Sequence, residues 1–511
     1  MLRKNLGPIQ IQLISLGGII GSGYFLGVGP ILKQNGASTL LAFLLGGLIV
    51  WLVSMAMSEL CVGMKREGSF VSQSRELLGR PWAAGVGWSY WFNWCAYIPS
   101  EMLAGGMILH EFYPNTSVIT WAALFAMIIT AVNLLNVKYF GHVESGLSLL
   151  KISAMGVFTA IGGLIWLGVI GQEPTPALLT PFIGPLPQSA LANVEPILPG
   201  GAFAFLITMV LVLVNFQGTE LIALSAAESK NPEKDIPRAT RNVALRIVLL
   251  YMLPITVLIL IFPLQEATAD HSAFAAALSR YGFSNWALVL QWVIITAALS
   301  CSNSGLYGAV RSLYGLGKEG LAPPWVSKVN AEGVPAYATW MTIGVCWAFL
   351  PLYYFFENST FYTWLLSVSG FTGALCWISI TFCQIQMRKK MKQEGVSVKT
   401  LAYWMPGFPY LSWLSLGLQL MCLVFLAFHP TLRSSLILGI PAFAVPAIFC
   451  WAKDRKQQSA EKVIKIGKKR TPSSGTPGRS GVGGNESGSE DYDDTMAARG
   501  AISNGETVIH P

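Results

Sequence analysis

Two ionisable side chains lie in the middle of stretches that are otherwise apolar. Glu101 falls within residues 82–109 and Lys151 within residues 144–171, and both stretches are long enough to cross a bilayer as helices. A charge at the bilayer centre costs about 2.5–3.5 kcal/mol on insertion scales, so such residues mark functional positions by default. Lys151 can exchange a proton there, and Glu101 can bind a polar or cationic group. The alternatives are a structural carboxylate and a lysine that reaches the membrane surface.

A glycine-rich stretch interrupts the first apolar segment, residues 9–34. It reads Gly-Gly-Ile-Ile-Gly-Ser-Gly over residues 17–23, with four glycines in seven positions. Each glycine costs about 0.5–1 kcal/mol relative to alanine inside a helix, so the helix is expected to break here. A break at membrane depth leaves backbone groups unpaired unless protein, water or a ligand satisfies them. The stretch is therefore either a binding site or a place where small residues let another helix pack closely.

A second interruption follows about 200 residues later, within residues 200–226. The apolar run there gives way to Asn-Phe-Gln-Gly-Thr-Glu over residues 215–220. Two interrupted segments at matching places in two halves of a chain are the best sequence indication of a transporter site between inverted repeats. The sequence thus predicts one repeat in residues 9–171, a second in residues 200–386, and two additional spans in residues 387–452.

The two breaks offer complementary backbone groups. Amide groups at the start of a helical segment suit an anion, and carbonyl groups at the end of one suit a cation. A small molecule that carries both charges is an amino acid. We predict that it is bound by the amides of Gly21, Ser22 and Gly23, by the carbonyls of Ile19, Ile20, Asn215 and Phe216, and beside Gly218 and Glu101. Phe216 is predicted to gate the site, with plain packing as the alternative, and Glu220 to anchor the second break.

The composition places these segments in a membrane protein. The chain of 511 residues is 53% hydrophobic and only 12% charged. We expect an all-α polytopic fold with about twelve transmembrane helices and no separate soluble domain of useful size. The expected spans are residues 9–34, 38–62, 82–109, 118–137, 144–171, 200–226, 241–264, 284–314, 334–356, 361–386, 408–429 and 433–452.

Basic residues indicate how the spans are oriented. With residues 1–8 in the cytoplasm, the inner loops carry most of the Lys and Arg residues, whereas the outer side holds only Lys33, Arg280 and Arg433. This asymmetry predicts an even number of spans with both termini cytoplasmic, and residues 172–199 as an external loop. The net charge of +8 then reflects topology and gives little support to a nucleic-acid partner. Residues 453–511 are expected to form a disordered cytoplasmic tail.

Residue types that serve catalysis or metal binding show no useful pattern. The eight cysteines lie in or at the ends of spans without paired short spacings, and the five histidines are scattered near span ends and in loops. Neither a disulfide framework nor a zinc site is indicated, and no phosphate-binding Gly-Lys loop is present. We therefore expect no metal, no cofactor and no enzymatic activity.

Several motifs resemble one family of membrane transporters. They are GGIIGSGYF at residues 17–25, FQGTEL at 216–221 with AESKNP at 227–232 and IPRA at 236–239, and NSGLY at 303–307. Over residues 5–450 the chain resembles the amino acid permeases of the amino acid, polyamine and organocation transporter superfamily, in the branch with bacterial and fungal amino acid permeases. The resemblance implies a leucine-transporter-like fold, a 5+5 inverted repeat with broken helices 1 and 6.

The resemblance also implies a function. It implies proton-coupled amino acid uptake, and Lys151 matches a fifth-span lysine that replaces the sodium ion of sodium-driven relatives. Two departures bear on gating and substrate size: charged residues 65–67 precede the Gly-Ser-Phe of the second loop, and Gln217 stands where small residues are common. We expect a plasma-membrane amino acid:proton symporter that works by alternating access, with a free amino acid, a proton and the lipid bilayer as partners. A proton-independent exchanger and a non-transporting amino acid sensor are the alternatives.

Overall fold

Helices dominate the structure, as the sequence predicts. The computed structural model describes residues 20–64, 70–135, 140–171, 200–220, 240, 242–245, 247–330, 333–356, 358–430 and 432–470. This part of the chain contains no strand, and each of the expected spans overlaps at least one of its helices. In chain order these helices are α2 (Ser22–Phe25), α3 (Val28–Asn35), α4 (Thr39–Gly63), α6 (Arg80–Phe112), α7 (Val118–Leu135), α8 (Phe140–Trp166), α10 (Gly201–Val214), the π-helical turn η3 (Ile247–Met252), α13 (Leu253–Ile261), α15 (Ser284–Lys318), α16 (Ala336–Phe349), α17 (Asn358–Gln393), α18 (Tyr410–Leu426) and α19 (Leu436–Arg470).

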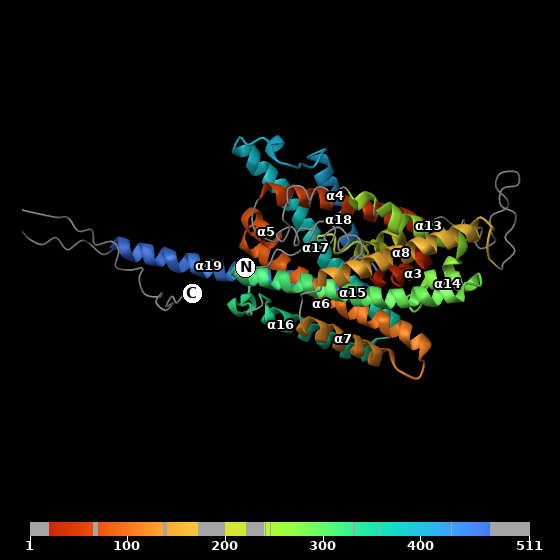
Figure 1. The fold of residues 1–511 in the computed structure, drawn as a ribbon. Helices are drawn as coiled ribbons and strands as arrows, with labels where there is room; N and C mark the ends of the chain where they lie inside the picture. Colours follow the sequence, from red (N-terminus) through yellow and green to blue (C-terminus); the bar gives the residue numbers. More distant parts are fainter. Residues whose placement is uncertain are drawn as a thin grey trace, which may run out of the picture. The chain divides into compact units, whose positions relative to one another are not determined.

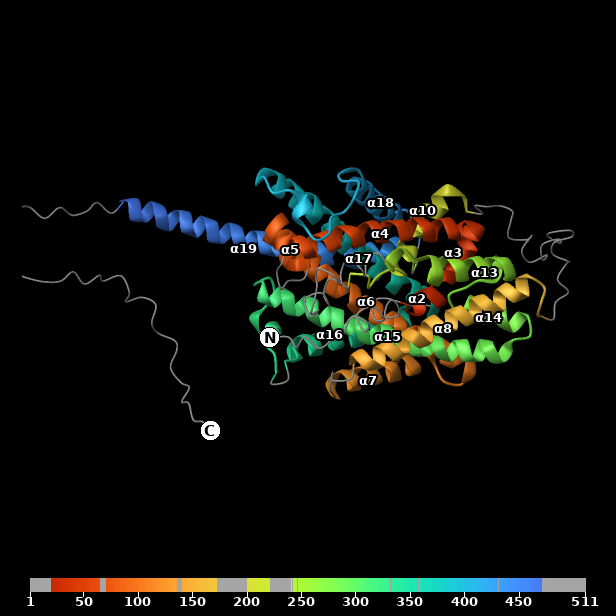
Figure 2. The ribbon, with the colours of Figure 1, turned by 45° about the horizontal axis from the view of Figure 1, so that its top comes forward.

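The helix α6 lies at the centre of the unit that ends at Arg455. It packs against both α15 and α17, and Figures 1 and 2 show α6 and α15 running side by side. Tryptophan, tyrosine, asparagine and glutamate side chains interrupt its apolar sequence, and those between Tyr90 and Glu101 are all buried. Because other helices surround α6, its polar side chains meet protein groups instead of lipid.

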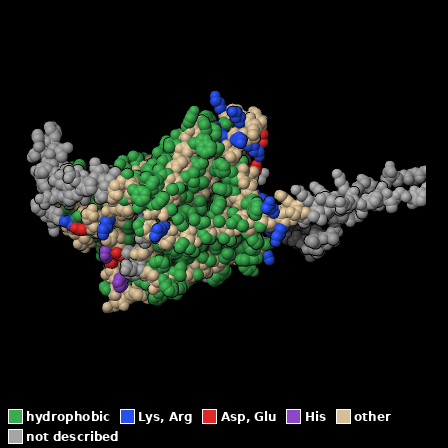
Figure 3. Space-filling model, turned by 180° about the vertical axis from the view of Figure 1, so that it is seen from behind, with side chains coloured by type: hydrophobic (Ala, Val, Ile, Leu, Met, Phe, Trp, Pro, Cys, Tyr) green, Lys and Arg blue, Asp and Glu red, His purple; other side chains and the backbone are tan. Residues whose placement is uncertain are grey.

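The outer surface of this unit is apolar. Seven helical segments of the described chain are long and apolar enough to cross a membrane, and three shorter apolar helices accompany them. Their exposed side chains include Leu149 on α8, Val289 on α15 and Val424 on α18, each of which is about half exposed or more. Figure 3 shows one such face, which is covered by hydrophobic side chains between regions where charged side chains gather. A surface of this kind is stable only against lipid or protein.

Ion pairs join helix ends at both extremities of the bundle. At one extremity they link the short helix α5 (Phe70–Leu78), the start of α6, the ends of α15 and α17, and α19, through the pairs Arg75–Glu319, Arg80–Asp454 and Lys390–Glu76. At the other they are Arg280–Glu266 and His271–Glu111. Partly exposed pairs of this kind contribute about 0–1 kcal/mol each to stability. They show which helix ends are neighbours, but they stabilise the fold little.

A buried ion pair joins α17 to α4, and the segment after α17 bonds to the same carboxylate. Glu59 is fully buried, and its carboxylate accepts two hydrogen bonds from the Arg388 guanidinium. It also accepts from Gln384 Nε2 and from the Met405 amide, both at 2.9 Å. Arg388 in turn donates to the Met405 carbonyl at 2.9 Å. A buried carboxylate is tolerated only when its oxygen atoms are satisfied in this way.

The last helix continues beyond the expected twelfth span. The sequence predicts a disordered tail from residue 453, but α19 runs to Arg470. Residues 455–463, Arg-Lys-Gln-Gln-Ser-Ala-Glu-Lys-Val, are mostly good helix formers, which explains the extension. The chain divides into two units after Arg455, and residues 456–470 belong to the second unit. Residues 471–511 lie outside the described part of the chain.

A titratable contact holds the segment before α14 (Ala273–Arg280) to the end of α6. His271 Nδ1 lies 2.6 Å from Glu111 Oε1, and Gln291 Nε2 on α15 donates to Glu111 Oε2 at 2.8 Å. The hydrogen bond to Glu111 raises the pKa of the His271 imidazole, and Asp270 adds to this effect, while partial burial opposes it. Protonation of His271 therefore strengthens the contact.

We expect the thermal stability of the protein in detergent to fall as the pH rises above about 6.5, the ordinary pKa of histidine. A pKa that is raised in the folded state contributes stability that is complete below the unfolded-state pKa and is lost as the pH rises through the folded-state pKa. The effect is small, because the His271 side chain is 65% exposed and solvent screens the pair. The unfolding temperature should depend less on pH, below and above about 6.5, in His271→Ala and in Glu111→Gln than in the wild type. A wild-type curve parallel to those of both variants would contradict the assignment.

Candidate functional site

The first break lies where the sequence predicts it. Ile20 and Gly21 are not helical, and Gly21 is extended, with φ −112° and ψ −167°. The short helix α2 begins at Ser22 and is followed, after a turn, by α3. Ile19 and the glycines before it lie outside the described residues. The backbone therefore enters α2 from an extended segment that is buried inside the bundle.

The Glu101 carboxylate accepts a hydrogen bond from the backbone amide of Ser22. Ser22 N donates to Glu101 Oε2 at 2.8 Å and to Oε1 at 3.1 Å, and Glu101 is fully buried on α6. The Ser22 hydroxyl lies 3.2 Å from the Tyr362 hydroxyl of α17. The sequence predicts a substrate carboxylate at this amide and Glu101 beside the side chain of the substrate. In the structure the two predicted functions meet at one place.

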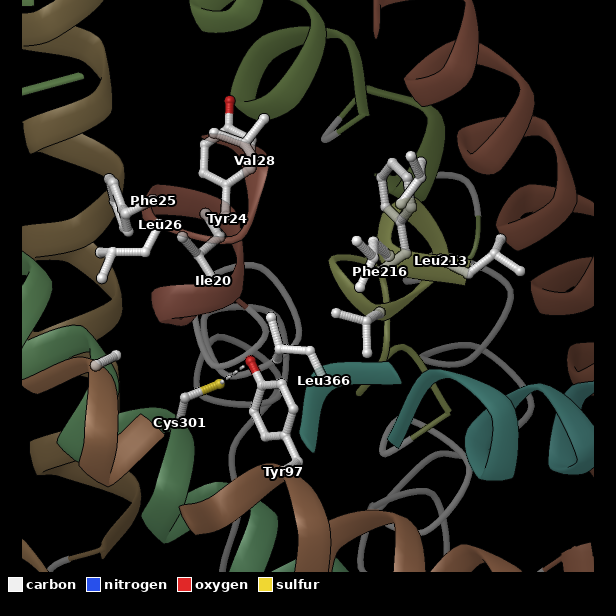
Figure 4. Packing of buried hydrophobic residues seen from close by; sticks show 14 of the residues in the cluster. Ile20, Tyr24, Phe25, Leu26, Val28, Tyr97, Leu213, Phe216, Cys301 and Leu366 are labelled. Atoms are coloured by element: carbon white, nitrogen blue, oxygen red, sulfur yellow. Dashed lines mark hydrogen bonds between the residues drawn. The ribbon is translucent and has the colours of Figure 1, made fainter. Parts of the chain in front are cut away.

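Three side chains converge on Gly21. A Cβ atom at this position would lie 2.4 Å from Glu101 Oε1, 2.6 Å from the Tyr97 hydroxyl and 2.9 Å from Cys301 Sγ. Figure 4 shows Tyr97 and Cys301 facing each other just beyond Ile20, and their Oη and Sγ atoms are 3.7 Å apart. No side chain fits at residue 21 unless these groups move, so glycine lets polar groups from α6 and α15 approach the backbone closely.

The second predicted break falls at the end of a helix, and residues 221–239 lie outside the described residues. The helix α10 ends at Val214, and residues 215–220 form turns. Gly218 has φ +96°, a backbone conformation that disfavours other residues. The Glu220 carboxylate accepts hydrogen bonds from Gly218 N at 3.0 Å, Tyr90 Oη at 3.2 Å and Trp377 Nε1 at 3.0 Å. The predicted anchoring of the break by Glu220 requires hydrogen bonds of this kind.

Asn215 connects the second break to the first. A Cβ atom on Gly23 would lie 3.7 Å from Asn215 Oδ1, so the two breaks approach each other here. Asn215 Nδ2 donates to the Leu211 carbonyl at 2.7 Å, and the Asn215 carbonyl accepts from Tyr251 Oη at 2.9 Å. Oδ1 is buried and has no hydrogen-bond partner within the described part of the chain. A buried acceptor without a partner is costly, and a donor on a ligand would satisfy it.

Phe216 is fully buried beside the second break. Its ring centroid lies 4.7 Å from that of Tyr251 and 5.8 Å from that of Phe43. In Figure 4 Phe216 lies across from Ile20 and Tyr24 of the first break. This aromatic packing is compatible with a closed gate and with plain core packing, so gating by Phe216 stays a prediction.

Lys151 is buried and does not reach the membrane surface. Its side chain is fully buried on α8, and Nζ donates to Ser300 Oγ of α15 at 2.8 Å. Glu101 lies within electrostatic range of Lys151 and of Cys301, the residue after Ser300. The structure thus brings the two charged residues singled out in the sequence to one polar centre next to the first break.

Other residues of this centre carry no sequence signal of their own. Tyr362, Cys301 and Ser300 belong to residue types that are common in the packing of membrane helices, and nothing in their spacing points to the breaks. Gln217 does stand out in the sequence, and the structure shows its amide bonded to the Ser369 carbonyl and hydroxyl at 3.1 and 2.9 Å. Within the described residues, no group of three or more His, Cys, Asp or Glu residues is arranged to hold a metal ion.

The long apolar helices, the apolar outer surface and the two breaks at a buried polar centre define a multi-pass helical membrane protein. Residues 10–465 match the family model described as amino acid permease. Amino-acid permease RocC of Bacillus subtilis (strain 168) is 33% identical over 456 residues, which cover 88% of this chain and 94% of that protein. The lysine-specific permease LysP of Escherichia coli (strain K12) is 32% identical over 421 residues, 80% of this chain and 83% of that protein. A putative histidine permease of Bacillus subtilis (strain 168) is 32% identical over 473 residues, 92% and 97% of the two chains.

The chain therefore belongs to the amino acid permease family of the amino acid, polyamine and organocation superfamily. Permeases are transporters, so this membership agrees with the prediction that the protein is not an enzyme. It also agrees with the predicted amino acid substrate and membrane setting.

Proposed function

We propose that the protein is an amino acid:proton symporter that imports amino acids across the plasma membrane by alternating access. The observation that carries the proposal is the meeting of both breaks with a buried lysine and a buried carboxylate. Interrupted helices at membrane depth are the usual place where transporters bind a substrate and a coupling ion. A buried lysine can release and take up a proton, so it can couple transport to a proton gradient.

The proposed binding mode assigns each end of the amino acid to one set of groups. The substrate carboxylate binds the amides of Ser22 and Gly23, where it replaces the Glu101 carboxylate. The substrate ammonium group donates to Asn215 Oδ1, a buried acceptor without a partner in the described structure, and to nearby backbone carbonyls. The displaced Glu101 carboxylate then faces the substrate and favours a cationic or polar side chain. Two relatives are named for lysine and histidine, which supports this preference.

The proposed orientation places both termini in the cytoplasm. Ion pairs of α5, α15, α17 and α19 bring together the helix ends that hold most basic residues of the described chain. The opposite extremity includes Arg280, and the sequence places only Lys33 and Arg433 with it. Cytoplasmic sides of membrane proteins carry such an excess of lysine and arginine.

Uptake into proteoliposomes tests the function. The purified full-length protein is reconstituted in sodium-free buffer, and uptake of a labelled amino acid mixture is measured with and without an inwardly directed proton gradient. We expect accumulation above the external concentration only with the gradient. Exchange against preloaded amino acid without any effect of the gradient would contradict symport and identify an exchanger. Binding without transport would identify a sensor.

A further inference from the structure

We propose that Glu144 is the proton acceptor for Lys151, with the hydroxyl group of Ser300 as the relay between them. The three side chains then form a proton path from the polar centre toward the cytoplasmic end of α8. This inference rests on the proposed function, because it supplies the route by which a proton leaves Lys151.

The three groups form one continuous chain of hydrogen bonds. Lys151 Nζ donates to Ser300 Oγ at 2.8 Å, and Ser300 Oγ donates to Glu144 Oε1 at 2.5 Å. A serine hydroxyl has one proton to donate and lone pairs to accept, so it can serve both neighbours at once. All three side chains are at least 98% buried. Bulk water therefore does not exchange protons with them directly in this conformation.

The proton transfer balances without any other reactant. One N–H bond of the Lys151 ammonium breaks as a new O–H bond forms on Ser300 Oγ. The original O–H bond of Ser300 breaks as an O–H bond forms on Glu144 Oε1. The products are a neutral amine, a serine hydroxyl and a neutral carboxylic acid, so a positive and a negative charge disappear together. Rotation of the Ser300 hydroxyl prepares the path for the next proton.

The position of Glu144 gives the path its direction. Glu144 precedes Lys151 by seven residues, about two helical turns or 10 Å along α8. The start of α8 is the end that the proposed orientation places in the cytoplasm. Glu101 also interacts electrostatically with Lys151, and its carboxylate is held by the Ser22 amide at the break. Lys151 thus interacts with a carboxylate at the binding site and, through Ser300, with a carboxylate toward the cytoplasm.

Other titratable groups near the path have different partners. Tyr97 of α6 lies 3.7 Å from Cys301 of α15, and Cys301 is within electrostatic range of Glu101, Lys151 and Glu144. Tyr251 of η3, which packs against α8, donates its hydroxyl to the Asn215 carbonyl. Ser300 is hydrogen-bonded to both Lys151 and Glu144.

The test compares two hydroxyl groups on the same helix. Ser300→Ala breaks the path but leaves both charges in place, and Ser300→Thr keeps a hydroxyl group. Ser304→Ala is the matched control, since Ser304 is a buried serine one turn away whose hydroxyl has no hydrogen bond in the described structure. Glu144→Gln removes the proton acceptor. Each variant is reconstituted and assayed for gradient-driven uptake and for exchange of preloaded amino acid, with the labelled amino acid mixture as the probe.

We expect Ser300→Ala and Glu144→Gln to reduce gradient-driven uptake about 100-fold, the lower end of the effect of a positioned proton-transfer group. Exchange should persist in both, Ser300→Thr should restore uptake, and Ser304→Ala should match the wild type. Full gradient-driven uptake by Ser300→Ala would overturn the path while leaving symport intact. Loss of exchange together with uptake in Ser300→Ala would mean a structural role and would also overturn it. Absence of gradient-driven uptake in the wild type would remove the proposed function and the path together.

Discussion

Lys151→Ala is expected to abolish accumulation against a gradient while amino acid exchange continues. Lys151 is fully buried beside the first break and near Glu101, so it is the described cation best placed to respond to both a proton and the substrate. Alanine cannot carry a proton, and the internal amino acid concentration should then rise only to the external one. The readout is the accumulation ratio in proteoliposomes across a series of external pH values, which should lose its pH dependence.

Two further variants separate proton coupling from folding. Lys151→Arg keeps a positive charge that cannot be released, because arginine stays protonated in proteins, so it should fold and exchange but not accumulate substrate. Lys33→Ala, at an exposed lysine of α3, should behave as the wild type. Gradient-driven accumulation by both Lys151→Ala and Lys151→Arg would exclude Lys151 as the coupling residue.

Glu101→Gln is expected to change which amino acids are transported. The substitution keeps the size of the side chain but removes the negative charge next to the Ser22 amide. A hydrogen bond to a charged group contributes about 1.5–3 kcal/mol, which corresponds to about 10- to 100-fold in affinity. The apparent affinity for arginine and lysine should therefore fall by this factor, while that for leucine should change much less.

Competition assays measure this difference directly. Exchange of one labelled amino acid is inhibited by unlabelled arginine, lysine or leucine, and the inhibition constants of the wild type and the variant are compared. The buried carboxylate Glu59, which is bonded to Arg388 and not to either break, provides a comparison through Glu59→Gln. That variant should lose stability without a change in selectivity. Equal losses for arginine and leucine in Glu101→Gln would exclude the specificity role.

The polar residues of the breaks show which features of the site can be predicted from the sequence. Runs of glycine and polar residues in apolar segments predict both breaks, and α2 begins and α10 ends beside them. The function of Glu101 was only partly predictable. Its face of the helix follows from its spacing with Tyr97, but its contact with Ser22 N depends on how α6 is rotated against α2.

The fold class, the family and the places where helices are interrupted can be predicted without any knowledge of the tertiary structure. These properties are local, since apolar length defines a membrane helix and glycines or polar residues weaken one wherever they stand. The tertiary structure alone decided which groups meet. Ser22 and Glu101 are 79 residues apart, Lys151 and Ser300 are 149 apart, and Glu144 and Ser300 are 156 apart. Such pairs form through the packing and rotation of whole helices, to which every contact of the bundle contributes, so no spacing within one segment encodes them.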